Sequence, residues 1–75
     1  MRNLNRTMLV YFWDINKKSQ HIIKFNSTEL FDVNDSVVLL NSEYKIIEVK
    51  YVYDANNNMS IHYMVNLVEY DNVSN

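Results

Sequence analysis

The 75-residue chain contains no glycine, no proline and no cysteine, and this absence constrains how it can turn. Positions that need a positive φ must use asparagine or aspartate, which tolerate the left-handed region better than other residues with a Cβ atom. Asparagine is abundant, with twelve copies. We therefore expect turns at Asn16, Asn26, Asn34, Asn41 and the run at residues 56–58.

The same absence removes several kinds of chemistry. Without cysteine the chain has neither a disulfide nor a thiolate metal site, and without glycine it has no Gly-rich phosphate loop. Its two histidines, His21 and His62, show no metal-ligand spacing and fall in predicted strands, where alternation puts His21 on one face with Ile23 and Phe25. We interpret them as half-buried or surface side chains. The sequence thus predicts no catalytic residues, no metal, no cofactor and no enzymatic activity.

β-Branched and aromatic residues gather in short runs separated by polar turns, the pattern of strands. We predict an all-β fold, a five-stranded antiparallel small barrel or roll in which residues 1–75 form a single domain and 1–6 and 71–75 are flexible. At most one short helical turn is expected, near residues 27–32, capped by Ser27 or Thr28. The inward face of the fourth strand should switch at a bulge near Ile46 and Ile47. The five predicted strands cover residues 7–15, 20–26, 36–40, 44–53 and 59–70.

Residues 31–53 carry a loose motif of apolar residues around an acidic turn. The segment resembles the F-x-V-G-D-x-V-x-L … Y-x-I-x-x-V stretch of small SH3-like barrels from phages and bacteria, with Asn34 in place of the usual glycine. The resemblance implies a fold and no activity, because SH3-like barrels host many unrelated functions. The matching residues are Phe31, Val33, Asp35, Val37, Leu39, Tyr44, Ile46 and Val49.

Residues 7–15 are apolar on both faces of the predicted strand, more than one small core needs. Either this strand is central and covered on both sides, or one face meets a partner. The only tryptophan, Trp13, then either fills the core or anchors an interface, and the sequence leaves both open. A second candidate surface is the outward row of the last strand. The candidate protein-binding residues are Tyr11, Trp13, Ile15, His62, Met64 and Tyr70.

The net charge and the distribution of apolar residues limit which partners the chain can bind. The net charge of −2 argues against extensive phosphate contacts, which need clustered positive charge, although lysines near exposed tyrosines keep nucleic acid or a nucleotide signal open as a partner. Mimicry of DNA by the acidic residues is a weaker alternative.

No stretch has the length of a transmembrane helix and no signal peptide is evident, so we expect a cytoplasmic protein without a membrane partner. A domain this small buries little surface, so a homodimer is possible.

Residue usage points to an AT-rich gene, which is frequent in low-GC bacteria and their phages. Our hypothesis is a non-catalytic accessory protein of a phage or mobile element, acting in the host cytoplasm. It would bind and inhibit or modulate a host protein, such as a defence or replication factor. The alternatives are a virion structural or assembly component, and a binder of nucleic acid or of a nucleotide signal.

Overall fold

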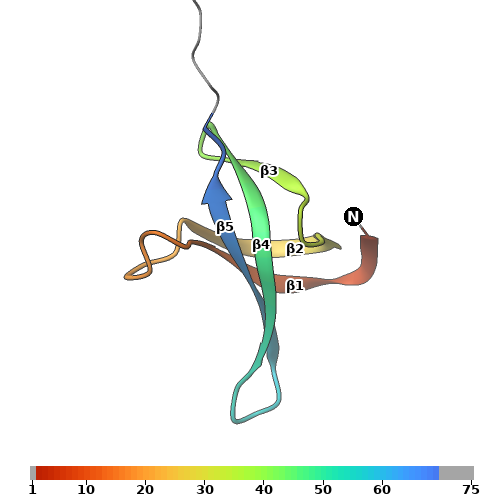
Figure 1. Ribbon diagram of the computed structural model, residues 1–75. Helices are drawn as coiled ribbons and strands as arrows, with labels where there is room; N and C mark the ends of the chain where they lie inside the picture. Colours follow the sequence, from red (N-terminus) through yellow and green to blue (C-terminus); the bar gives the residue numbers. More distant parts are fainter. Residues whose placement is uncertain (1, 70–75) are drawn as a thin grey trace, which may run out of the picture.

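The computed structural model describes residues 2–69, and within them the chain forms one curled, five-stranded sheet without helices (Figure 1). The order across the sheet is β2-β1-β5-β4-β3. The prediction of a five-stranded all-β fold is confirmed. The strands are β1 (Arg2–Asp14), β2 (Ile23–Leu30), β3 (Ser36–Leu39), β4 (Ser42–Tyr53) and β5 (Met59–Leu67).

One strand pair departs from the predicted antiparallel arrangement. β1 and β5 lie side by side and run parallel, with Val10 beside Ile61 and Phe12 beside Tyr63. The other three pairs, β1–β2, β3–β4 and β4–β5, are antiparallel. Parallel neighbours need a long connection, and here residues 15–58 supply it by forming β2, β3 and β4. The pairing places β1, whose second half is apolar on both faces, beside β5 in the interior of the sheet.

The core occupies one face of the sheet, which we call the inner face. Phe12 and Tyr63 stack at its centre with ring centroids 4.8 Å apart, and Phe31 packs edge-on against Tyr63 at 5.7 Å. The Tyr63 hydroxyl accepts a hydrogen bond from the backbone N–H of Phe31 at 3.1 Å, so the segment after β2 is fixed to the core. The buried apolar residues are Val10, Phe12, Leu39, Ile46, Ile61, Tyr63 and Val65.

Asparagine takes the place of glycine where the backbone demands it. Asn34, Asn41 and Asn57 have φ of 79°, 70° and 63°, as predicted for turns built without glycine. Leu40 also has a positive φ, 51°, although a bulky aliphatic residue is unfavourable there. The register of β4 against β5 shifts between Ile46 and Glu48, so the predicted bulge is confirmed. Ile46 is buried and Ile47 is 43% exposed.

Two predictions about the β1–β2 pair are wrong. β1 begins at Arg2 and not at residue 7, because its first residues pair with the end of β2, Arg2 with Leu30. The predicted turn or helix cap at residues 26–28 is strand. The Ser27 hydroxyl accepts a hydrogen bond from the N–H of Glu29 at 2.9 Å, which satisfies the backbone where the β1–β2 register shifts. Asn26 therefore lies within β2, paired with Leu9.

Candidate functional site

The strand register places two predicted surfaces side by side on the opposite face of the sheet, which we call the outer face. Tyr11 of β1 lies beside His62 of β5, and Trp13 lies beside Met64. Each row continues onto β4, where His62 is paired with Lys50 and Met64 with Glu48. The parallel β1–β5 pair thus merges the apolar second face of β1 with the outward row of β5. Within residues 2–69, no further strand or helix covers this face.

A stacked row of side chains crosses the outer face from β2 through β1 to β5. The rings of Tyr11 and His62 are 4.4 Å apart and almost parallel, at 7°. On the β2 side of Tyr11, the Lys24 ammonium lies 5.7 Å from the ring centroid, a cation–π contact. Because β1 lies between β2 and β5, Tyr11 has Lys24 on one side and His62 on the other. Both faces of its ring are occupied, which leaves no free platform on Tyr11 for a nucleobase.

His21 completes the aromatic cluster from the loop before β2. Its ring meets Tyr11 edge-on at 5.4 Å and Trp13 at 5.7 Å. The sequence prediction put His21 on one face with Ile23 and Phe25 by strict alternation. That prediction is wrong because β2 begins only at Ile23, so the alternation does not extend back to His21.

A hydrogen-bonded chain fixes the orientation of Trp13. Its indole N–H donates to Nδ1 of His62 at 2.9 Å, and Nε2 of His62 lies 3.0 Å from the Ser60 hydroxyl. Since Nδ1 accepts, the neutral ring carries its proton on Nε2 and donates it to Ser60 Oγ. Burial lowers the pKa of His62 below its ordinary value of 6.5, and the same neutral form is the one that accepts from Trp13.

The tautomer of His62 decides what this Ser–His pair can do. A histidine that activates a serine nucleophile must accept the hydroxyl proton on an unprotonated nitrogen, while a carboxylate or carbonyl holds the other N–H. Here Nε2 donates to Ser60, and the opposite nitrogen faces an indole N–H. The arrangement orients Trp13 and leaves the Ser60 hydroxyl unactivated.

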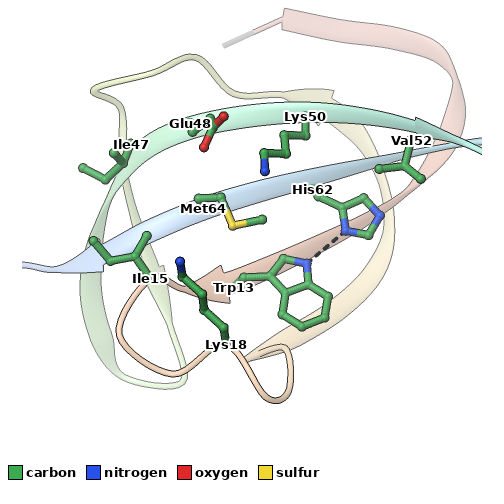
Figure 2. A pocket seen from close by; sticks show the side chains of 9 residues that line it. All are labelled: Trp13, Ile15, Lys18, Ile47, Glu48, Lys50, Val52, His62 and Met64. Atoms are coloured by element: carbon green, nitrogen blue, oxygen red, sulfur yellow. Dashed lines mark hydrogen bonds between the residues drawn. The ribbon is translucent and has the colours of Figure 1, made fainter.

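Beside the aromatic cluster the outer face is hollowed (Figure 2). The hollow has a volume of about 370 Å³, within the range of sites that hold a side chain or small ligand. Its apolar lining comes from all three middle strands and the loop after β1, and the side chains of Lys18 and Lys50 reach over it from opposite sides. The lining residues are Trp13, Ile15, Lys18, Ile47, Glu48, Lys50, Val52, His62 and Met64.

Local hydrogen bonds hold the loop that carries Ile15 and Lys18. The N–H of Ile15 donates to the Val65 carbonyl at 3.0 Å, extending the β1–β5 pairing. The Asp14 side chain accepts from the N–H of Asn16 at 2.9 Å, and the Asn16 amide reaches Asn66 on β5 at 3.3 Å. The loop is therefore attached to β5 along the side of the hollow.

Four of the six predicted binding residues line one hollow: Trp13, Ile15, His62 and Met64. Tyr11 stacks next to them, and Tyr70 lies outside the described residues. Trp13 is only partly buried and faces away from the core, so it does not fill the core. The prediction missed Lys18 of the loop after β1 and all four β4 residues of the lining, which are Ile47, Glu48, Lys50 and Val52. The bulge it placed near Ile46 and Ile47 was the available signal for Ile47.

Comparison with known proteins gives no assignment: no protein-family model matches the chain, and no curated protein or solved structure matches it. The resemblance of residues 31–53 to SH3-like barrels stays a prediction. Among residues 2–69, no group of three or more His, Asp or Glu side chains is arranged to hold a metal ion. The same residues contain no helix of the length and apolarity that crossing a membrane requires.

Proposed function

We propose that this chain is a non-catalytic binding protein that attaches to another protein through the outer face of its sheet. The observation that carries the proposal is the hollow around Trp13, which opens on a face that no other described element covers. Ile47 and Val52 at this site are 43% and 44% exposed. Apolar side chains gathered around a partly exposed tryptophan are typical of the centre of a protein interface.

The site is also prepared in advance for binding. Trp13 is held by the hydrogen bond to His62 and by rings on two sides, Tyr11 at 6.2 Å and His21 at 5.7 Å. A side chain already fixed in one conformation loses little entropy when a partner covers it. This rigidity favours recognition of a defined partner.

For the biological role, we propose an accessory protein of a phage or mobile element that binds a host protein and blocks it, with defence and replication factors as the leading targets. The AT-rich residue usage, the small size and the outer-face hollow support this role. A virion assembly component using the same face is the alternative, since it would also bind protein and would differ only in the partner.

The test is affinity capture from a lysate of a low-GC bacterium with the wild-type chain and three variants. Met64→Gln and Ile47→Asp alter the hollow, the first with little change in volume and the second at an exposed bulge. Leu40→Asn is the matched control, because it removes an apolar side chain that is 68% exposed in the β3–β4 turn.

We expect the same protein to be retained by the wild type and by Leu40→Asn, and to be lost with both hollow variants. Retention by every form would show that binding uses another surface. Light scattering on the pure chain tests the homodimer: if a dimer forms and dissociates with Ile47→Asp, the partner at this face is a second copy.

A further inference from the structure

We propose that the partner segment that occupies the hollow is acidic: a stretch of protein with carboxylates on both sides of one aliphatic or aromatic side chain. This inference rests on the proposed function and specifies the chemistry of the partner. The aliphatic or aromatic side chain would insert over Met64, and the carboxylates would meet the lysines around it.

The charge distribution over the sheet supports this partner. Lys24, Lys45 and Lys50 share the outer face by their register with Tyr11, Asn66 and His62, and Lys18 joins them at the hollow. Opposing them on this face are Glu48 beside Met64 and Glu43 beside Val38. The outer face therefore has an excess of positive charge, although the whole chain carries −2.

The positions of the charges match a segment with a central anchor. Figure 2 shows the ammonium groups of Lys18 and Lys50 pointing from opposite sides toward Met64. Between them the surface is aliphatic, formed by Ile15 and Met64 with Ile47 and Val52 at its border. Apolar contact in such a hollow supplies most of the affinity, while exposed charges mainly steer association and select the partner.

The same geometry disfavours nucleic acid at this site. Single-stranded nucleic acid binds through successive bases stacked on free aromatic faces. Both faces of Tyr11 are occupied, which leaves Trp13 as the single Phe, Tyr or Trp ring of the hollow lining on which a base could stack. Glu48 lines the hollow and repels any anion beside it, and a nucleic acid carries a phosphate at every nucleotide. A protein segment can avoid Glu48 by placing its carboxylates only near the lysines.

The experiment selects binders from a displayed library of short random peptides on the immobilised wild-type chain, with parallel selections on the double variant Lys18→Glu, Lys50→Glu. A fluorescein-labelled peptide with the enriched sequence is then titrated against both forms. We expect enrichment of peptides with at least two Asp or Glu around an aliphatic or aromatic residue. Their affinity should fall about tenfold or more in the double variant and should weaken as salt is added.

The outcomes separate the acidic partner from the binding site itself. Enriched peptides that are neutral or basic, yet lose binding with Met64→Gln and Ile47→Asp, would overturn the acidic partner and leave the proposed function standing. If no enriched peptide depends on the hollow, both proposals are overturned. Lysine-dependent binding of a labelled single-stranded oligonucleotide, without any acidic peptide, would replace the protein partner with nucleic acid.

Discussion

The hydrogen bond between Trp13 and His62 can be isolated by a double-mutant cycle. Trp13→Phe removes the indole donor, and His62→Phe removes the Nδ1 acceptor while keeping a flat ring against Tyr11, now 4.4 Å from His62. A hydrogen bond of this kind contributes about 0.5–1.5 kcal/mol to stability. The donor–acceptor distance of 2.9 Å is favourable and the pair is partly buried, so we expect a coupling energy of about 1 kcal/mol.

The assay is urea unfolding of the wild type, both single variants and the double variant, followed by far-UV circular dichroism because Trp13→Phe removes the only tryptophan. Urea unfolding gives the free energy of unfolding of each variant, and with a slope m of about 1–3 kcal/mol per M of urea a change of about 1 kcal/mol is a measurable shift of the midpoint. The double variant should lose about 1 kcal/mol less than the sum of the single losses.

A control cycle combines Trp13→Phe with Leu40→Asn in the β3–β4 turn, and there the effects should add. If the Trp13 and His62 effects also add to within about 0.3 kcal/mol, the hydrogen bond does not hold Trp13 and the account of the fixed site is wrong.

Three further predictions concern pH, a turn and the core. Burial lowers the pKa of His62 below 6.5, so the stability that the neutral ring contributes is complete above pH 6.5 and is lost as the pH falls from there through the folded-state pKa. His62→Gln should therefore reduce the slope of the free energy of unfolding against pH over that interval. An unchanged slope would contradict the lowered pKa of His62. Leu40→Asn should relieve the unfavourable φ of 51° and raise stability by about 0.5–1 kcal/mol, seen as a higher calorimetric Tm; an equal or lower Tm counts against it. Tyr63→Phe leaves the Phe31 N–H without its acceptor at 3.1 Å and should cost about 1–3 kcal/mol with faster exchange of that amide proton, whereas a loss under about 0.5 kcal/mol would show that this contact does not fix the segment after β2.

Local features of the fold could be predicted from the sequence because they depend on neighbouring residues. Alternation along β5 predicts four inward side chains, since side chains alternate between the faces of a strand: Ile61, Tyr63, Val65 and Leu67. The first three are buried, whereas Leu67 at the end of the strand is 40% exposed. The break in alternation at Ile46 and Ile47 gave the bulge for the same reason. Asn34, Asn41 and Asn57 marked positive-φ positions because few other residues tolerate them.

The pairing of β1 with β5 could not be predicted in this way. Both strands are apolar enough to be central, but nothing in their local sequence specifies which strands are neighbours or in which direction they run. The site depends on this pairing: Tyr11 and Trp13 meet His62 and Met64 only because the two strands are adjacent and parallel. The sequence therefore indicated two surfaces where the structure has one.

Polar strands and loop residues account for the remaining differences. Residues 2–6 are mostly polar and look loose in the sequence, yet pairing with the end of β2 makes them strand. A serine in this position is typical of a helix cap because its hydroxyl can accept from a nearby backbone N–H. In the structure the Ser27 hydroxyl makes such a bond with the N–H of Glu29 inside a strand, where the β1–β2 register shifts.

Trp13, as the only tryptophan, allows the most direct test of the central claim that the outer face binds a partner protein. The measurement is acrylamide quenching of its fluorescence in the free chain and in the complex with the captured partner. We predict that binding protects Trp13 and shifts its emission to shorter wavelength, and that Leu40→Asn behaves in the same way. A saturated complex in which quenching and emission of Trp13 equal those of the free chain would contradict the claim.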